Sequence, residues 1–100
     1  MYYIYIIYSE ASDLYYVGYS DNPQRRLTEH NSSPHNTFTS KHRPWEFEAV
    51  FECGENEASA ILIERFIKKQ KSRVFIEKII AAEKFDGVLA QLVRVPIFRD

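Results

Sequence analysis

Residues 2–19, YYIYIIYSEASDLYYVGY, are the stretch that decides the fold. Tyr2–Tyr8 and Leu14–Tyr19 are both rich in β-branched and aromatic residues, which are enriched in strands. Ser9–Asp13, between them, supplies the small polar residues that are common in turns. The stretch therefore predicts a β-hairpin, in which two antiparallel strands are joined by a turn.

A helix is expected directly after the hairpin. Ser20–Asn22 supplies helix-capping residues, and Pro23 suits the first helical position because no amide hydrogen is needed there. We expect this helix to end near Asn31. Asn31–Pro44 follows as a polar connection, and a connection of that length inside a domain is usually functional or mobile.

The second half of the chain predicts a strand followed by two helices. Trp45–Cys53 alternates apolar and polar residues, which predicts a strand with one mostly solvated face. Glu57–Lys71 has the apolar spacing of a long helix, and Ser72 can cap a shorter helix over Arg73–Ala82. Val88–Val93 has no clear preference for helix or strand. The expected order is β-β-α-β-α-α, an α+β fold whose three mostly antiparallel strands are flanked by helices.

Length and composition indicate one globular domain. The chain has 100 residues, 45% of them hydrophobic and 15% aromatic, with few glycines and prolines, which excludes a disordered chain. A chain of this size buries roughly two-thirds of its unfolded surface, so a core can form without disulfides. We expect residues 1–82 to form the domain and residues 83–100 to form an extension of undetermined structure.

Charge and targeting signals exclude several classes of protein. The formal net charge of −1 argues against a protein that coats nucleic acid, so any contact with phosphates is expected to be local. Cys53 is the only cysteine, which leaves no basis for an intramolecular disulfide or a thiolate zinc site. Met1–Tyr8 is too short for a membrane anchor and lacks the basic flank of a signal peptide. We expect a cytoplasmic protein.

Three sets of residues are candidates for chemistry. Tyr5 and Tyr16 lie eleven residues apart on the paired strands, so their side chains could emerge on one face of the sheet. Arg26 and His30 are four residues apart and share one face of the first helix. Glu64 falls just past the edge of the apolar band of the long helix, where a carboxylate can hold a hard cation such as Mg²⁺.

Each of these sets also has a purely structural explanation. Tyrosine rings commonly pack in a core with only the hydroxyl in water, and the chain has seven tyrosines. Arg26 could be an ordinary surface arginine, and Glu64 could form an ion pair with Lys68 one helical turn away. No set decides between the two explanations alone. Their order and spacing together favour the chemical one.

This order and spacing resemble the GIY-YIG nuclease family. Tyr3-Ile4-Tyr5 stands where the family has its GIY triplet, and Tyr16-Val17-Gly18 stands where it has YIG. Arg26 and Glu64 occupy the positions of the family arginine and of its metal-binding glutamate. The resemblance covers about Tyr2–Ile80. It is to the short, free-standing bacterial members, which are related to the N-terminal domain of the excision-repair nuclease.

The resemblance implies hydrolysis of a phosphodiester bond with one metal ion, Mg²⁺ or Mn²⁺. In that scheme Tyr5 helps to activate the attacking water, with Tyr16 within hydrogen-bonding reach. Arg26 stabilises the charge on the phosphate, and Glu64 holds the metal ion. His30 matches a position that is often histidine in the family and could contact the substrate or orient a water molecule.

Further residues are candidates for binding nucleic acid. Gly18 is a place where backbone and ligand can approach closely. Lys41 and His42 could meet phosphates from the long connection, and Lys68 extends the polar face of the helix that carries Glu64. Two departures from the family pattern stand out: the first residue of the GIY triplet is a tyrosine, and the late asparagine of some homing endonucleases has no clear counterpart. We also expect no attached DNA-binding domain.

Three functions are compatible with these residues. The leading one is a metal-dependent endonuclease whose partner is nucleic acid, in particular DNA, and which acts in repair or on structured DNA. The first alternative is a catalytically weak module that binds nucleic acid with the same face. The second is an interaction domain whose Trp45–Cys53 strand and C-terminal tail form a homodimer or bind a partner protein. Glu64 favours the enzyme, because binding alone would not require a carboxylate among cations.

Overall fold

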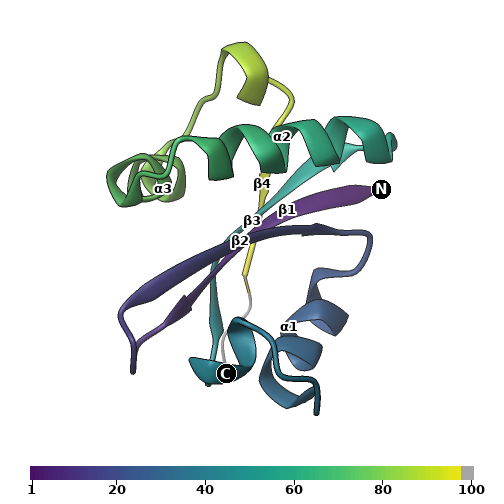
Figure 1. Ribbon diagram of the computed structural model, residues 1–100. Coiled ribbons are helices and arrows are strands. Elements are labelled where there is room, and N and C mark those ends of the chain that lie inside the picture. The colour runs from purple at the N-terminus through teal and green to yellow at the C-terminus, as the bar shows by residue number, and fades with distance from the viewer. Residues whose placement is uncertain (98–100) are drawn as a thin grey trace.

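The computed structural model describes residues 1–97 and contains one antiparallel sheet of four strands with helices on both faces (Figure 1). The strands lie in the order β2-β1-β3-β4. The elements in chain order are β1 (Tyr2–Ser9), β2 (Leu14–Ser20), α1 (Pro23–Ser32), the 3-10 turn η1 (Thr39–Lys41), β3 (Glu46–Gly54), α2 (Glu57–Lys69), α3 (Arg73–Ala81), the 3-10 turn η2 (Gly87–Leu89) and β4 (Val93–Val95). The predicted α+β fold is confirmed, with a fourth strand that the expected order lacks.

Local signals in the sequence explain where the helices begin and end. Asn22 caps α1 by accepting a hydrogen bond from an amide of the first turn, and Pro23 occupies the first helical position. Ser72 caps α3 in the same way. Both starts agree with the prediction. α2 ends at Lys69, slightly before its expected end, and Lys71 then takes a left-handed backbone conformation (φ 48°) that a right-handed helix cannot contain.

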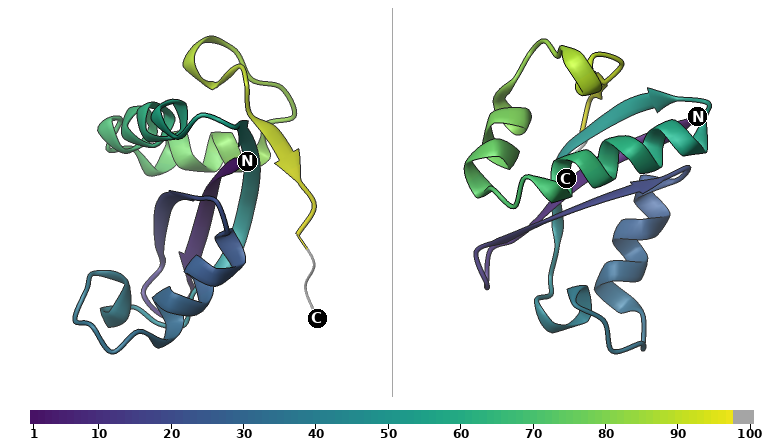
Figure 2. Two further views of the ribbon diagram at one scale, coloured as in Figure 1. Left: turned by 90° about the vertical axis from the view of Figure 1, so that its right-hand side faces the viewer. Right: turned by 45° about the horizontal axis from the view of Figure 1, so that its top comes forward.

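The sheet separates α1 on one face from α2 and α3 on the other (Figures 1 and 2). A cluster of buried side chains lies on each face. One face carries Ile4 and Ile6 and packs against α2 and α3. The other face carries Tyr5 and Ile7 and packs against α1, through Leu27, and against the connection that follows it. Because β1 is a central strand covered on both faces, these four consecutive residues of β1 are all buried.

The expectation that Trp45–Cys53 has one mostly solvated face is wrong. β3 lies between β1 and β4, and both of its faces are covered. Phe47 and Val50 pack on the α1 side, whereas Ala49 and Phe51 pack on the α2 side. A shift in register between β1 and β3 breaks the two-residue alternation, as a β-bulge does. The same placement removes the exposed β3 edge that a dimerising strand would need.

Residues 83–97 pack at the edge of the sheet that is opposite β2 (Figure 2). Val88–Val93, for which neither helix nor strand is predicted, contains most of η2 and the first residue of β4. β4 pairs with β3, and the Arg94 guanidinium donates to two carbonyl groups at the end of α3, at 2.6 and 2.8 Å. These contacts join the extension to the sheet. The part of the predicted extension formed by residues 98–100 lies outside the described residues.

The apolar start of the chain belongs to the sheet. Tyr2–Ser9 forms β1, as the sequence predicts, and pairs on both sides with other strands. The longest helix, α2, has 13 residues. Within residues 1–97, no helix has the length and apolar character needed to cross a membrane.

Candidate active site

The predicted site residues gather along the edge strand β2, which lies between α1 and α2 (Figure 1). Tyr16, on β2, is contacted from both sides. From α1, the His30 ring lies 5.1 Å from the Tyr16 ring, measured between centroids. From α2, Lys68 Nζ lies 5.0 Å from the centroid of the same ring. The two helices cover opposite faces of the sheet, yet side chains from both reach this edge.

Tyr5 approaches the site from β1 by crossing over Gly18. The two residues are paired in the β1–β2 ladder. A Cβ atom added to Gly18 would fall on the ring and hydroxyl of Tyr5, so any larger residue would displace the ring. The predicted reason for Gly18, room for a ligand, therefore needs correction, because Tyr5 fills that room. Tyr5 itself is 1% exposed.

A buried chain of hydrogen bonds connects Tyr5 to η1 through His30. The Tyr5 hydroxyl is 2.8 Å from His30 Nε2, and His30 Nδ1 is 2.8 Å from Thr39 Oγ1. Burial of His30, assisted by the charge of Arg26, lowers its pKa to about 4. The ring is therefore neutral near pH 7, so that one nitrogen donates and the other accepts. Either Tyr5 donates to His30 and His30 to Thr39, or both bonds run the other way.

Arg26 and Tyr5 influence each other's protonation. Burial raises the pKa of Tyr5 to about 12, although the nearby Arg26 guanidinium opposes the shift. Burial lowers the pKa of Arg26, but the interactions with Tyr5 and Glu29 together raise it by more, so the net shift is upward. Arg26 Nη1 donates to Glu29 Oε2 at 3.2 Å. Near pH 7 the site thus presents a neutral tyrosine hydroxyl beside a permanently charged guanidinium.

A cavity of about 280 Å³ opens beside these residues. Its walls include Tyr16, Arg26 and His30, together with Phe38 and other residues of the α1–β3 connection. Tyr5 and Glu64 are not part of its lining. A guanidinium in the wall of such a cavity is well suited to bind an anion with oxygen acceptors, such as a phosphate group.

Glu64 lies on α2 with its side chain 17% exposed and forms an ion pair with Lys68 at 3.1 Å. The structural alternative considered for Glu64 is therefore present. Its charge also contributes, after the larger effect of burial, to the raised pKa of Tyr5 and of Tyr19. In the described part of the chain, no three His, Cys, Asp or Glu side chains form a group that could hold a metal ion. Glu64 fits a divalent cation whose other ligands are water and substrate oxygens, a common arrangement for Mg²⁺.

The remaining predicted contacts to nucleic acid lie on and around η1. Lys41 is exposed on η1 itself. His42 follows it, with Nδ1 2.9 Å from Ser12 Oγ in the hairpin turn and its ring 4.9 Å from the ring of Phe38, between centroids. His42 is therefore engaged with the hairpin and with Phe38, whereas Lys41 extends from the surface of the connection.

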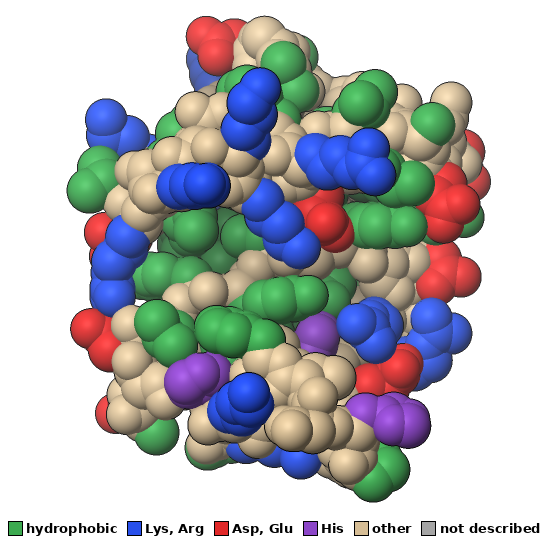
Figure 3. Space-filling view, viewed as in Figure 1, with side chains coloured by type: hydrophobic (Ala, Val, Ile, Leu, Met, Phe, Trp, Pro, Cys, Tyr) green, Lys and Arg blue, Asp and Glu red, His purple; other side chains and the backbone are tan. Residues whose placement is uncertain are grey.

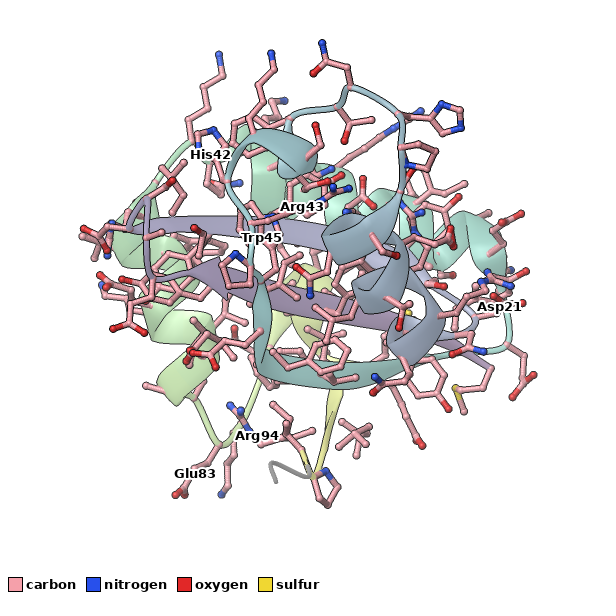
Figure 4. The ribbon with its side chains drawn as sticks, turned by 90° about the horizontal axis from the view of Figure 1, so that it is seen from below. Asp21, His42, Arg43, Trp45, Glu83 and Arg94 are labelled. Carbon is pink, nitrogen blue, oxygen red and sulfur yellow. The ribbon has the colours of Figure 1, made fainter. Side chains whose placement is uncertain are left out.

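Unpredicted contacts hold the α1–β3 connection in place. Arg43 donates to two carbonyl groups at the end of α1, both at 2.6 Å. Trp45 Nε1 donates to the carbonyl group of Thr39 at 2.8 Å. Figure 4 shows where Arg43 and Trp45 lie at the end of this connection. Only the length and polarity of Asn31–Pro44 indicate its importance in the sequence; neither reveals Thr39 as the partner of His30.

Comparison with known proteins agrees with the arrangement. A family model described as the GIY-YIG catalytic domain matches residues 1–78. A search among curated proteins finds no match. The family match spans β1 to α3, and therefore includes the strands and both helices that surround the site. This chain belongs to the GIY-YIG catalytic domain family of nucleases.

Proposed function

We propose that the protein is a metal-dependent endonuclease that hydrolyses phosphodiester bonds in DNA at the β2 edge. One observation carries the proposal: Tyr16 is flanked on the α1 side by His30, which hydrogen-bonds Tyr5, and on the α2 side by Lys68, which is paired with Glu64. A cation, hydroxyl groups and a carboxylate therefore converge on one strand. Groups of these kinds stabilise the charge that develops in phosphoryl transfer and hold the metal ion that assists it.

Each of these residues has a proposed role. Arg26, in the wall of the cavity, donates to the phosphate oxygens and stabilises their charge in the transition state. Glu64 holds Mg²⁺ or Mn²⁺, which supplies Lewis-acid activation of the phosphate. Tyr16 also lines the cavity, so its hydroxyl is the one that a substrate or attacking water would touch. The family resemblance gives activation of the attacking water to Tyr5, but Tyr5 is buried and outside the cavity. We therefore assign that role to Tyr16 and propose that Tyr5 holds His30 and Arg26 in place.

The charge distribution supports a short contact with nucleic acid. The net charge of −1 is the sum over the whole chain and does not describe the surface around the site. Lys41, His42 and Lys68 all lie near the β2 edge or on the connection beside it. We assign these three residues to the phosphates next to the cleaved one. Repair or processing of structured DNA in the cytoplasm would suit a domain that holds only a few phosphates.

Residues 1–82 are proposed to carry the catalytic function, and residues 83–97 to brace it. All the proposed catalytic residues lie before Ser72. The later segment adds η2 and β4 at the sheet edge away from the site, where Leu89 and Leu92 join the core.

A specific observation supports a second candidate, a module that binds nucleic acid without cutting it. Glu64 already forms an ion pair with Lys68 at 3.1 Å, so a divalent cation must compete with this ammonium group. If Lys68 does not release Glu64 when DNA binds, the same face would hold phosphates without hydrolysing them.

The test is a panel of labelled single-stranded, duplex and branched DNA and of RNA, each incubated with the protein and Mg²⁺ or Mn²⁺. We expect cleavage of at least one DNA substrate, loss of cleavage with EDTA, and loss in Glu64→Gln. Glu57→Gln is the matched control, because Glu57 lies in the exposed first turn of the same helix. Equal rates in wild type and Glu64→Gln would contradict the proposed site. Binding without cleavage across the panel would favour the second candidate.

A further inference from the structure

A second hollow lies on the α2 side of Tyr16, next to the cavity that Arg26 lines. Its volume is about 320 Å³, and its walls include Tyr16, Phe38, Ile67 and Ile76, with Lys68 and Lys71 among its residues. Figure 3 shows, on this face of the molecule, a hollow with hydrophobic side chains and with lysine and arginine side chains around it. We call the six named residues the base pocket. Apolar walls with a cationic rim suit a flat apolar group that carries negative charge at its edge.

Phe38 and Tyr16 line both the base pocket and the first cavity. Phe38 is the more open of the two candidates for stacking. Phe38 is 51% exposed, which is unusual for a phenylalanine. Its position is nonetheless defined: its ring lies 24° from parallel to the Tyr16 ring with 6.2 Å between centroids, and it also contacts His42. The connection that carries it is anchored through Thr39 and Trp45. Phe38 is therefore an open aromatic surface held in a fixed place beside the proposed catalytic cavity.

Lys71 adds a positive charge to the rim of the base pocket. It adopts φ 48°, a left-handed conformation in which glycine or asparagine is usual at a helix end. Lysine contributes there what glycine cannot, a positive charge at the rim of the pocket. Lys68 places a second ammonium group over the face of Tyr16.

We propose that the base pocket receives one unpaired nucleobase adjacent to the cleaved phosphate, so that the protein acts on single-stranded or locally unpaired DNA. This inference rests on the proposed function of the β2 edge. Aromatic side chains bind bases by stacking, whereas bases in a duplex are stacked on each other and must leave the helix to enter a pocket. Lys68 and Lys71 would hold the phosphates on either side. The pocket walls are mainly apolar, so we expect little preference among the four bases.

The test measures binding in EDTA, where metal-dependent cleavage cannot occur. Fluorescence anisotropy would compare a short single strand, the same strand with one abasic position, and a blunt duplex of the same length. We expect the single strand to bind more tightly than the duplex. Phe38→Ala should weaken binding by about 5-fold or more, the lower end expected for loss of one stacked base. Phe38→Trp should bind like wild type, and so should the control Leu62→Ala, an exposed apolar residue on α2.

The abasic strand links the protein side chain to the base. At the critical position, an abasic site should weaken binding to wild type as much as Phe38→Ala does, with little further loss when the two are combined. Additive losses at every position would overturn the base pocket. So would equal affinities of wild type and Phe38→Ala for the intact strand, and so would a duplex bound as tightly as the single strand.

Lys71 provides a variant in which a loss of binding can be separated from a loss of stability. Lys71→Gly relieves the left-handed backbone and should not lower Tm, yet it should weaken binding of the single strand and reduce the slope of log K against log salt by about 0.7. Lys69→Gly is the control for a lysine outside the pocket, and Lys69→Gln the control for loss of charge alone. Unchanged affinity and salt slope in Lys71→Gly would contradict the role of the rim.

Failure of this inference and failure of the proposed function give different results. If cleavage depends on Glu64 but Phe38→Ala and abasic strands change nothing, the base pocket is wrong and the nuclease assignment stands. If single strands bind through Phe38 but no substrate is cut, the pocket stands and the nuclease assignment is wrong. Absence of binding to any nucleic acid would overturn both.

Discussion

Tyr5 and Gly18 are coupled at the scale of single residues, because the ring of one occupies the space that the other leaves free. That placement brings the Tyr5 hydroxyl to His30, which in turn contacts Tyr16 and Thr39. A larger residue at Gly18 would therefore displace Tyr5 and, through it, disturb His30 and its contacts with Tyr16 and Thr39. The glycine acts through space and not through backbone conformation, and its effect can be measured separately.

Gly18→Ala should destabilise the protein by about 1–3 kcal/mol, the usual effect of overpacking a buried position. The cause is the overlap of the new methyl group with the Tyr5 ring. Urea denaturation would measure it in wild type and in a Tyr5→Ala background. In the second background the substitution should cost little, because the ring is gone. The same cost in both backgrounds would refute the coupling.

His30 should make stability depend on pH below neutrality. Its pKa falls from 6.5 to about 4 on folding, so between these values the unfolded state binds more protons. The free energy of unfolding should therefore decrease as pH falls from 6.5 towards 4, by at most about 1.4 kcal/mol per pH unit from this residue. Denaturation at several pH values should show a flatter dependence in His30→Gln. The exposed His35 is the control, and a similar flattening in His35→Gln would contradict the assignment.

Elements with local signals could be predicted from the sequence, whereas elements formed by distant contacts could not. Asn22 and Ser72 start helices through their own side chains, so α1 and α3 begin where expected. β4 has three residues and forms only by pairing with β3, which no local pattern indicates. The same distinction applies to the site. Spacing predicts Arg26 on a face of α1, but Thr39 becomes a partner of that helix only through the folded connection.

Replacing Arg43, which holds the α1–β3 connection, should lower the free energy of unfolding more than replacing Arg25, an exposed arginine of α1. Arg43→Met removes a charged donor from two carbonyl groups and should cost about 1.5–3 kcal/mol of unfolding free energy. Arg25→Met removes only exposed ion pairs on the surface of α1 and should cost less than about 1 kcal/mol. Urea denaturation of both variants provides the comparison. Equal losses would mean that the connection is not held by Arg43.

At the scale of the whole molecule, the two edges of the sheet have different roles. Side chains from α1 and α2, on opposite faces, meet at the β2 edge, whereas β4 forms the other edge. Residues 83–97 place Leu89 and Leu92 in the same core cluster as β1 and α2. β4 covers the side of β3 that would otherwise be an edge. The catalytic residues and the bracing segment thus lie at opposite edges of one sheet, and the second should affect stability more than chemistry.

Truncation after Ala82 should therefore destabilise the fold. It uncovers β3 and removes two buried leucines, each of which contributes about 2 kcal/mol or more to a core. Thermal and urea unfolding of residues 1–82 should give a lower Tm and a smaller free energy of unfolding than the full chain. Equal stability of the two proteins would show that η2 and β4 are accessory to the fold.

The most direct test of the central claim, a phosphodiester-cleaving site at the β2 edge, compares two adjacent arginines of α1. Arg26 lines the cavity and lies beside Tyr5, whereas Arg25 forms exposed ion pairs with Asp21 and Glu29. The measurement is the single-turnover cleavage rate of the best DNA substrate with Mg²⁺ or Mn²⁺. We predict that Arg26→Ala lowers this rate by about 100-fold or more, as loss of a transition-state donor does, while Arg25→Ala stays within a few-fold of wild type. Equal rates for the two variants would contradict the account.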